Sequence, residues 1–459
     1  MTSKPCLNPA LKKFWRTRSP LRVLYGGRSS SKSWDCAGFA IFLAQNYKIK
    51  VVCARQFQNK IDESVYSLLK IQIERFGLSD FFDIQKNKII CNKTGSEFLF
   101  YGIARNIDEI KGLEGVDILW LEEVQAITKA QWEIIEPTIR KEGSQIWVVF
   151  NPQYITDFSY QRFIANPPKN SLVKKINYTD NPFLSKTMLD KIEAAKEEDY
   201  KDYEHVYLGY AKQDNDESII KMSWIDAAID AHLKLNFTAV GDKKLGYDVA
   251  DSGQDANAIA IAHGSVLTEM SEWHAGEDEL MKSCRRVYNK AIEQGCEIIY
   301  DSIGVGAFCG SNFKEINAST DLHYLKASYQ GWNAGGKVLN PKRKYSDKKT
   351  NEDMFSNAKA QAWWLVADRF KNTYDAINNG TEYNDDQLIS ISSDIENLEQ
   401  LKMQLSTPLK DEDNNGRVKV ESKKDLKKRD IKSPNDADAF IMAFTKAKSG
   451  GISAYIRKG

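Results

Sequence analysis

The feature that most constrains this chain is a short apolar run followed by a glycine- and serine-rich stretch that ends in Lys-Ser. Residues 22–25 read Arg-Val-Leu-Tyr, residues 26–33 read Gly-Gly-Arg-Ser-Ser-Ser-Lys-Ser, and an apolar stretch follows from Trp34. This order predicts a strand, a phosphate-binding loop and a helix. In such a loop, backbone N–H groups at the helix start face the phosphates of a nucleotide, Lys32 neutralises them, and the Ser33 hydroxyl ligates Mg²⁺.

The loop departs from the usual pattern at one position. Ser31 stands where the last glycine before the lysine is expected, and a side chain there narrows the space for a phosphate beside the backbone. An ordinary serine-rich turn is therefore an alternative. Under the nucleotide-binding interpretation the whole loop contacts ATP through Gly26, Gly27, Arg28, Ser29, Ser30, Ser31, Lys32 and Ser33.

A second pattern supports the nucleotide-binding interpretation. Residues 115–123 read Gly-Val-Asp-Ile-Leu-Trp-Leu-Glu-Glu, which predicts a buried parallel strand whose end delivers Glu122 and Glu123 beside the phosphate loop. We expect Glu122 to hold the metal through water and Glu123 to polarise the attacking water. A core strand with a solvated acidic end is the alternative for this segment alone, but the two patterns together favour a nucleoside triphosphatase.

Two further side chains are candidates for the same site. Arg28 would either stabilise charge on the transferring phosphoryl group or form a surface ion pair. Asn151 follows a predicted strand at 145–150 and precedes Pro152, so it would either sense the γ-phosphate or form a plain Asn-Pro turn. The other expected elements alternate strands with helices, which indicates a mostly parallel sheet: a strand at 48–55, a helix over 58–77, a hairpin spanning 89–102 and a helix at 129–140.

The length of 459 residues exceeds what one core normally holds, so two domains are expected. We place an ATPase domain at 1–211, a linker with a bridging helix at 212–240, where the composition becomes polar, and a second domain at 241–459. The formal net charge of +1 excludes an overall polycation, so nucleic acid would have to bind at local basic patches.

The chain lacks the sequence signs of secretion or membrane insertion. No apolar run reaches the roughly 18 residues that span a bilayer, and the N-terminus lacks the layout of a signal peptide. The seven cysteines are scattered and form no zinc-binding pattern, which is typical of reduced thiols in cytoplasm. We therefore expect a soluble protein.

The second domain carries three candidate metal-ligating aspartates. Asp248 interrupts an apolar strand, and Asp301 ends the predicted strand 296–301 at a glycine-rich turn. A buried carboxylate in a strand is costly unless it faces a metal or another partner. The runs 258–263 and 266–270 look like antiparallel neighbours in the same sheet.

The third aspartate lies on a helix near the C-terminus. Ser433 is expected to cap this helix and Pro434 to take its first position. Asp436 and Asp438 then point to different faces, and Asp438 shares the face that packs on the sheet. Each aspartate taken singly is more often a cap or turn residue. As a set they match a ribonuclease H-like nuclease, in which clustered carboxylates hold two Mg²⁺ or Mn²⁺ ions for phosphodiester hydrolysis.

Two basic segments are candidates for contact with DNA phosphates, at 337–349 and 417–429. The second follows an Asn-Gly pair that predicts a hairpin turn, so its cations would flank the nuclease site on a projecting ribbon. A solvated charged loop is the alternative for each segment.

These motifs together resemble the large terminase subunit of tailed bacteriophages, with the closest likeness to the podophage type. The matching stretches are 26–33, 119–123, 150–152, 177–182, 433–435 and Asp438, in the family's order and spacing. Two departures stand out: Ser29 and Ser31 replace glycines, which puts ATP affinity in doubt, and Ile303 replaces a further aspartate of close relatives, so an auxiliary metal role there is absent.

The resemblance implies an α/β protein with a P-loop ATPase domain and a ribonuclease H-like nuclease domain. It implies a motor that uses ATP to move double-stranded DNA into a procapsid and cuts concatemeric DNA. Lys32, Ser33, Glu122 and Glu123 would serve the ATPase, and Asp248, Asp301 and Asp438 the nuclease, with Mg²⁺ or Mn²⁺ in both sites. The implied partners are the small terminase subunit and the portal protein, in a homo-oligomeric ring without membrane contact, and the implied location is the host cytoplasm.

Two other functions are compatible with part of the pattern. An ATP-dependent helicase or DNA-repair nuclease would share the ATPase motifs but needs a second helicase-like lobe, which the sequence after residue 215 does not show. A non-catalytic DNA-binding module with a decayed nucleotide loop would explain Ser31.

Overall fold

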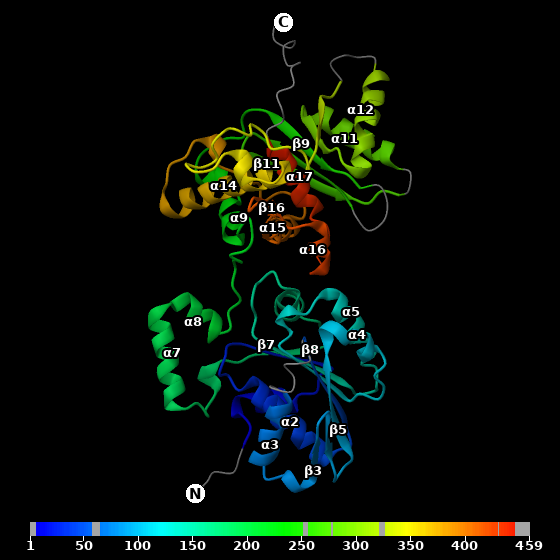
Figure 1. The fold of residues 1–459 in the computed structure, drawn as a ribbon, viewed down its shortest axis with the longest axis vertical. Helices are drawn as coiled ribbons and strands as arrows, with labels where there is room; N and C mark the ends of the chain where they lie inside the picture. The colour runs from blue at the N-terminus through cyan, green and yellow to red at the C-terminus, as the bar shows by residue number, and fades with distance from the viewer. Residues whose placement is uncertain are drawn as a thin grey trace. The chain divides into compact units, whose positions relative to one another are not determined.

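The computed structural model describes residues 6–56, 65–250, 256–276, 279–320, 326–429 and 431–445. The chain divides into two compact units, 1–213 and 214–459 (Figure 1). All seven cysteines are free thiols. No helix in the described part of the chain combines the length and apolar character needed to cross a bilayer.

The first unit is built on an eight-stranded sheet in the order β3-β4-β5-β2-β6-β7-β1-β8. The strands from β5 to β8 in this order run parallel, while β3 and β4 form antiparallel pairs at one edge. The strands are β1 (Leu21–Tyr25), β2 (Lys50–Arg55), β3 (Phe82–Gln85), β4 (Lys88–Cys91), β5 (Ser96–Gly102), β6 (Ile118–Glu122), β7 (Gln145–Phe150) and β8 (Ser171–Lys175).

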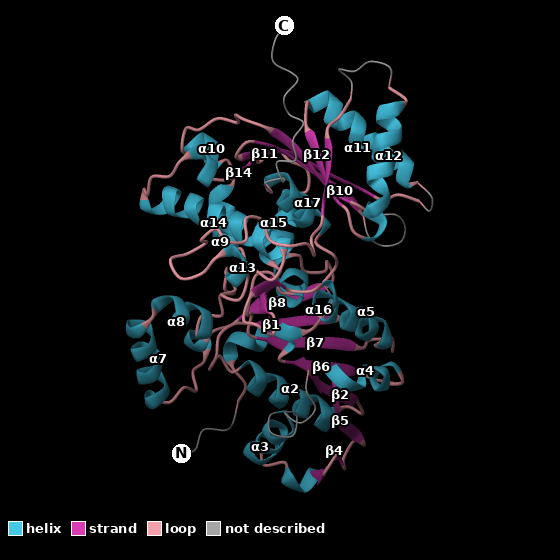
Figure 2. Ribbon diagram, turned by 45° about the horizontal axis from the view of Figure 1, so that its top comes forward, coloured by secondary structure: helices cyan, strands magenta, loops and turns pink. Residues whose placement is uncertain are grey.

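Helices cover both faces of this sheet, because the central strands are apolar on both sides (Figure 2). Cys53 and Trp120 pack in a cluster with Ile41 of α2, whereas the alternate residues Val52 and Leu121 pack with Ile135 of α5. The main helices are α1 (Lys12–Arg16), α2 (Lys32–Asn46), α3 (Ser67–Arg75), α4 (Ile103–Lys111), α5 (Lys129–Thr138), α7 (Lys186–Glu198) and α8 (Tyr200–Val206).

Most elements expected in this unit are present. The strand, loop and helix around residues 22–46 form as β1 and α2, and the hairpin over 89–102 forms as β4 and β5. The helix expected over 58–77 is described only as α3, since residues 57–64 lie outside the described part of the chain. The edge strand β3 was not foreseen.

The second unit holds a six-stranded sheet in the order β13-β12-β9-β10-β11-β14. β9, β10 and β11 are successive antiparallel neighbours, and β12 and β13 continue the sheet in parallel beside β9. This mixed arrangement is ribonuclease H-like, as expected. The strands are β9 (Lys243–Asp248), β10 (Asn257–His263), β11 (Val266–Trp273), β12 (Glu297–Asp301), β13 (Tyr329–Trp332) and β14 (Ser390–Ile391).

The two faces of this second sheet carry different helices. Ile259 and Ile261 of β10 pack with α11 and α12, whereas the alternating alanines of the same strand pack with α9, α14, α15 and α17. The helices are α9 (Met222–Ala228), α10 (Ala231–Lys234), α11 (Leu280–Gln294), α12 (Cys309–Ala318), α13 (Asn351–Met354), α14 (Ala358–Asn379), α15 (Leu398–Ser406), α16 (Lys423–Lys428) and α17 (Asn435–Phe444).

A glycine sets how closely α17 lies on the sheet. A Cβ at Gly246 of β9 would lie 2.0 Å from the carbonyl oxygen of Ala439 and 2.6 Å from the amide nitrogen of Ala443. Only a residue without a side chain allows this approach. Side chains alternate along a strand, so Asp248 projects from the same face of β9 as Gly246, toward α17.

The start of α17 differs from the expectation. Pro434 is the N-cap rather than the first helical residue, and no side chain caps the helix. The hydroxyl of Ser433 is buried without a hydrogen-bond partner in the described structure. The prediction that Ser433 caps this helix was wrong, because the bend at Pro434, with φ −83° and ψ 63°, displaces Ser433 from the capping position.

A linker with a bridging helix was expected at 212–240, and all of this stretch from residue 214 onward lies in the second unit. Ile225 and Ala228 of α9 are buried in the cluster that also contains Trp363 of α14.

Candidate active sites

The phosphate loop lies at the carboxyl end of β1, between β7 and β8. A hollow of about 670 Å³ opens there. It is lined by the loop residues 28–34, Glu122 and Glu123 from the end of β6, Asn151 after β7, and His205 and Val206. The structure therefore brings together the residues that the two sequence patterns predicted for one site.

The loop backbone is held close to the chain that covers it. A Cβ at Gly26 would lie 1.9 Å from the carbonyl oxygen of Ile176, and one at Gly27 would lie 1.9 Å from that of Tyr207. The amide of Arg28 donates a 2.7 Å hydrogen bond to the carbonyl of Val206. Both glycines are thus required by close approach.

Ser29 and Ser31 adopt the left-handed conformation that the replaced glycines would take easily, with φ of 61° and 68°. The Ser31 hydroxyl accepts a 3.0 Å hydrogen bond from Asn8 and donates one of 2.9 Å to Asp35 of α2. The carbonyl of Ser29 accepts a 2.7 Å bond from the amide of Asn181. These contacts hold the unusual backbone in place, so the loop keeps its form without the two glycines.

Lys32 is buried at the base of the loop. Its ammonium group donates to the carbonyl oxygens of Gly26 and Gly27, at 3.0 and 2.6 Å, and to the Ser30 hydroxyl at 2.9 Å. Burial lowers the pKa of Lys32 to about 8. The loop backbone thus surrounds the ammonium group of Lys32. A bound phosphate would take the place of the two carbonyl oxygens as the partner of this ammonium group, and it would bring a negative charge.

Glu122 joins the two motifs. The Ser33 hydroxyl donates a 2.6 Å hydrogen bond to Oε1 of Glu122, and the indole of Trp120 donates one of 2.9 Å to Oε2. Burial raises the pKa of Glu122 to about 7, although these bonds and the charges of Lys32 and Arg55 act in the opposite direction. A cation near Ser33 would favour the ionised carboxylate.

The side chain of Glu123 has a different partner from that of Glu122. It lies just after β6 with φ of 54°, and its half-exposed carboxylate forms an ion pair with Arg55 at the end of β2. Arg55 is a further residue of this site, to which the sequence motifs assigned no role. The available signal was a charged residue at the carboxyl end of a buried parallel strand that neighbours β6.

The remaining two predicted residues also line the hollow. Arg28 is exposed and Asn151 is half-buried. Both lie within the walls of the site, and the structure leaves their specific roles as predictions.

In the second unit, Asp248 and Asp301 end adjacent parallel strands. Tyr247 of β9 pairs with Tyr300 of β12, so the next residue of each strand is an aspartate at the same edge. Both carboxylates lie on the face toward α17, opposite to the side on which Tyr247 and Tyr300 pack.

The three predicted aspartates influence each other's charge. Burial raises the pKa of Asp248 well above its usual range, and the nearby charges of Asp438 and Asp301 raise it further. The pKa of Asp301 is also raised by burial and by Asp438. Lys359 and Lys423 oppose both shifts. The buried acidic cluster is therefore only partly neutralised by the protein's own cations.

Lys359, near the start of α14, is a residue that sequence reasoning missed. Its ammonium nitrogen lies 2.7 Å from Oδ1 and 2.9 Å from Oδ2 of Asp438, which is buried. A helical lysine 79 residues away carries no sequence signal for this contact. Within the described residues, no three His, Cys, Asp or Glu side chains are grouped so as to hold a metal as they stand.

Asp436 points away from this cluster, as predicted. Its Oδ2 accepts hydrogen bonds from the side-chain amides of Gln400, at 2.7 Å, and Gln404, at 3.3 Å. The separation of Asp436 from Asp438 on two faces of α17 is confirmed.

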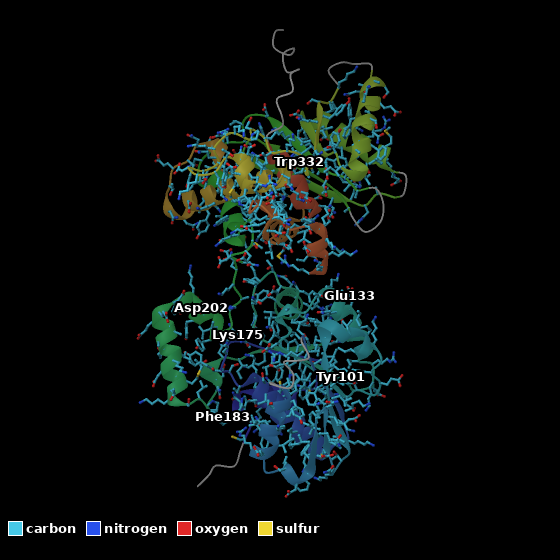
Figure 3. The ribbon with its side chains drawn as sticks, in the orientation of Figure 1. Tyr101, Glu133, Lys175, Phe183, Asp202 and Trp332 are labelled. Atoms are coloured by element: carbon cyan, nitrogen blue, oxygen red, sulfur yellow. The ribbon has the colours of Figure 1, made fainter. Side chains whose placement is uncertain are left out.

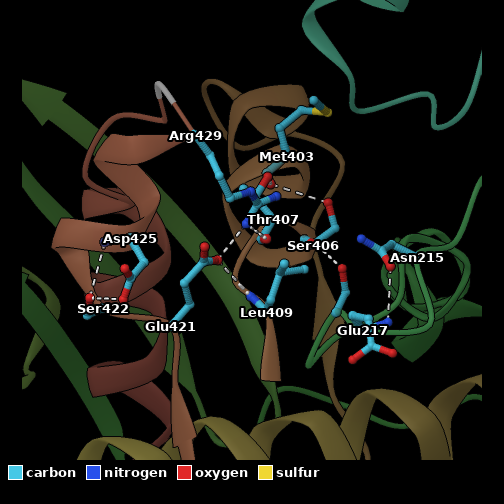
Figure 4. Close-up of polar contacts among 11 residues, drawn as sticks. Asn215, Glu217, Met403, Ser406, Thr407, Leu409, Glu421, Ser422, Asp425 and Arg429 are labelled. Atoms are coloured by element: carbon cyan, nitrogen blue, oxygen red, sulfur yellow. Dashed lines mark hydrogen bonds and ion pairs between the residues drawn. The ribbon is translucent and has the colours of Figure 1, made fainter. Parts of the chain in front are cut away.

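The basic segment 417–429 forms the expected hairpin, with β15 (Lys410–Glu412) and β16 (Val418–Val420) paired antiparallel and Gly416 in the turn at φ 71°. At its base, Arg429 contacts Glu421 at 2.5 Å, and Glu421 accepts a hydrogen bond from the amide of Leu409 (Figure 4). Arg417 and Lys419 also form ion pairs with aspartates of the same hairpin. Part of this positive charge is thus neutralised locally.

The first unit is similar to a known protein family. Residues 18–210 match the family model of the phage terminase large subunit. This stretch of the chain is similar to phage terminase large subunits. The chain is 26% identical over 234 residues to the terminase large subunit of Bacillus phage SPP1, a match that covers 44% of this chain and 52% of that protein. The match therefore spans about half the length of this curated relative.

Two solved terminase structures are also similar. The nuclease domain of the large terminase subunit of bacterial virus Sf6 is 29% identical, with a TM-score of 0.47, and covers 50% of this chain and 99% of that domain. The large terminase of a thermophilic bacteriophage is 13% identical, with a TM-score of 0.41, over 95% of this chain and 98% of that protein.

Proposed function

We propose that this protein is the ATP-driven motor of viral DNA packaging, which moves double-stranded DNA into a procapsid and cuts concatemeric DNA. The contact between Ser33 and Glu122 carries the proposal. Two motifs separated by 89 residues meet there at 2.6 Å, beside a buried lysine and an open hollow. This is the geometry that a magnesium-dependent nucleoside triphosphatase requires.

Mg²⁺ would be held by the Ser33 hydroxyl and by Glu122, directly or through water. The hard oxygen donors and the raised pKa of Glu122 fit a divalent cation. A bound ion would neutralise part of the phosphate charge. Lys32 would exchange its carbonyl partners for phosphate oxygens, and the loop amides would bind the remaining oxygens.

Hydrolysis needs a water molecule aligned with the γ-phosphate. Glu123 ends next to the hollow, and its ion pair with Arg55 restricts its carboxylate, so we assign Glu123 as the group that orients this water and Arg55 as its positioning residue. Arg28 is exposed on the same wall and would stabilise charge on the phosphoryl group, and Asn151 would sense its presence.

The second unit supplies the nuclease. Asp248, Asp301 and Asp438 would hold one or two Mg²⁺ or Mn²⁺ ions. The support is electrostatic: the charges of Asp301 and Asp438 raise the pKa of Asp248, and Lys359 and Lys423 oppose this shift without cancelling it. Bound ions would supply the charge that activates a water molecule and stabilises the leaving oxygen. The hairpin of β15 and β16 and the segment 337–349 would bind DNA phosphates without reading sequence.

The proposal extends to the domain division and the assembly. We assign 1–211 as the ATPase domain, 212–240 as linker and 241–459 as the nuclease domain, with a small terminase subunit, a portal protein and a homo-oligomeric ring as partners in the host cytoplasm. A helicase is disfavoured because the sheet of the second unit is mixed and ribonuclease H-like, rather than a second parallel ATPase lobe.

The test separates the two activities. Glu123→Gln should lower DNA-stimulated ATP turnover by at least about 100-fold while sparing Mn²⁺-dependent nicking of plasmid DNA, and Asp301→Ala should do the reverse. Glu133→Gln, which changes an exposed glutamate (labelled in Figure 3), and Asp394→Ala, which changes an exposed aspartate of the second unit, are the matched controls. Loss of both activities in either variant would show that the sites are misassigned.

A further inference from the structure

The stretch 303–308, which follows Asp301 closely in the chain, holds two large apolar side chains in solvent. The exposed fraction is 45% for Ile303 and 65% for Phe308. Among the described residues of the second unit, Phe308 is the one exposed phenylalanine, tyrosine or tryptophan. Scattered exposed apolar residues are ordinary, but two in one short stretch beside a proposed catalytic aspartate call for a partner. We refer to residues 303–308 as the apolar stretch.

The apolar stretch is held against the ends of both strands that carry the proposed metal ligands. A Cβ at Gly306 would lie 1.8 Å from the carbonyl oxygen of Asp301 and 3.5 Å from Cγ2 of Val249, the residue that follows β9. The amide of Ile303 donates a 3.1 Å hydrogen bond to Oδ1 of Asp301. The glycine thus allows close approach, and the stretch lies at the edge of the sheet where the nuclease site is proposed.

The backbone just before the apolar stretch contacts the strand that leads into a basic segment. The amide of Ser302 donates a 2.9 Å hydrogen bond to the carbonyl of Trp332, the last residue of β13 (labelled in Figure 3). A Cβ at Gly331 would lie 3.0 Å from the Cβ of Ser302. The basic segment 337–349, for which we propose contact with DNA phosphates, begins five residues after Trp332. A duplex bound by this segment and by the aspartates therefore passes beside the apolar stretch.

From this arrangement we propose that the apolar stretch is a wedge for duplex DNA, in which Phe308, with Ile303 beside the metal ligands, enters between base pairs next to the phosphodiester that is cut. The inference rests on the proposed nuclease function. Apolar side chains that enter between base steps unstack them in part and kink the duplex. Steps of a pyrimidine followed by a purine, such as TA and CA, deform most easily. The wedge therefore gives the nuclease a preference for these steps without any contact to base edges.

The first experiment measures unstacking without cutting. A short duplex carries the fluorescent base 2-aminopurine in a TA step and is mixed with the full chain and Ca²⁺, and a denaturing gel verifies that the duplex stays intact. Wild-type protein should raise the fluorescence, because the base loses its stacking neighbour. Phe308→Ala should lose this rise while still binding the duplex, as measured by anisotropy of an end label, and Phe308→Leu, which keeps an apolar wedge, should recover much of it. Leu233→Ala is the matched control, because it removes an equally exposed apolar side chain (66%) of the same unit, and it should behave as the wild type.

The second experiment maps the cuts. Plasmid DNA is nicked with Mn²⁺ and the new ends are sequenced. Wild-type protein should cut at TA and CA steps at least about 5-fold more often than at other steps, and Phe308→Ala should cut all steps more evenly.

The outcomes separate this inference from the proposed function. Wild-type protein that neither binds nor nicks DNA would overturn both. Wild-type protein that nicks DNA but gives no rise in fluorescence would overturn only the wedge. The same would follow from an equal rise and an equal cutting pattern in Phe308→Ala.

Discussion

Ser33 donates a 2.6 Å hydrogen bond to Glu122, and this bond joins the start of α2 to the end of β6. The carboxylate is buried, and the charges of Lys32 and Arg55 favour its ionised form without offsetting the effect of burial. In protein free of metal and nucleotide, Glu122 therefore costs stability when it ionises.

This cost gives a pH dependence whose sign is fixed. Burial raises the pKa of Glu122 from 4.5 to about 7, so its contribution to stability is fully present below pH 4.5 and is lost as the pH rises through 7. The loss is on the order of 3 kcal/mol. The side chain in Glu122→Gln cannot ionise. The melting temperature of this variant in EDTA, minus that of the wild type, should therefore increase from pH 5 to pH 8. A constant difference across that range would contradict the prediction.

Ser31 offers a test of how the loop tolerates its missing glycine. Ser31→Ala keeps the left-handed backbone but loses the bonds to Asn8 and Asp35, at about 1 kcal/mol each. Ser31→Gly loses the same bonds but relieves a backbone cost of roughly 1–2 kcal/mol. Chemical denaturation should therefore rank wild type and Ser31→Gly close together and Ser31→Ala about 2 kcal/mol lower. Equal stability of the alanine variant would mean that the hydroxyl anchors nothing.

Gly246 should be essential for the nuclease but not for the ATPase. A methyl group at this position meets backbone atoms of α17 at 2.0 and 2.6 Å, so Gly246→Ala must displace the helix that carries Asp438. We expect a loss of about 1–3 kcal/mol together with loss of DNA cutting, while ATP turnover is kept. Gly335→Ala is the control, because its Cβ would meet side-chain atoms only at 3.6 Å or beyond. Normal DNA cutting by Gly246→Ala would contradict the proposal that α17 positions Asp438 in the nuclease site.

Lys359 should stabilise the nuclease site when no metal is present. Removing it leaves Asp438 buried without its ion-pair partner, which costs about 3 kcal/mol or more. Lys359→Ala should thus melt at a lower temperature than the wild type in EDTA, and added Mn²⁺ should recover much of the difference. Lys359→Arg, which keeps the charge, should show a smaller loss. If Mn²⁺ stabilised wild type and Lys359→Ala equally, the lysine and the metal would not be acting on the same carboxylates.

The sequence predicted those features that depend on local pattern. The apolar runs of β1, β6 and β7 placed their strand ends, and because parallel strands end at one edge, Lys32, Glu122 and Asn151 fell into one site. The ends of β9 and β12 likewise placed Asp248 and Asp301 at the same edge of the second sheet.

The features that were missed depend on contacts between distant segments or on backbone detail. Lys359 and Arg55 act on carboxylates that lie far away in the chain. The hydrogen bond from Asn8 to the Ser31 hydroxyl joins residues that are 23 positions apart, and no local sequence pattern predicts such a contact. Ser433 followed the usual capping pattern, but the conformation at Pro434 removed it from the helix start.

The cover of the phosphate loop has one more consequence. The stretch that accepts the amide of Arg28 at Val206 and fits against Gly26 at Gly209 ends, four residues later, at Gln213, the last residue of the first unit. The segment that leads to the second unit therefore begins at residues that line the hollow. Its Lys212 pairs with Tyr154, which follows the lining residue Gln153, so two walls of the hollow meet in this one short segment.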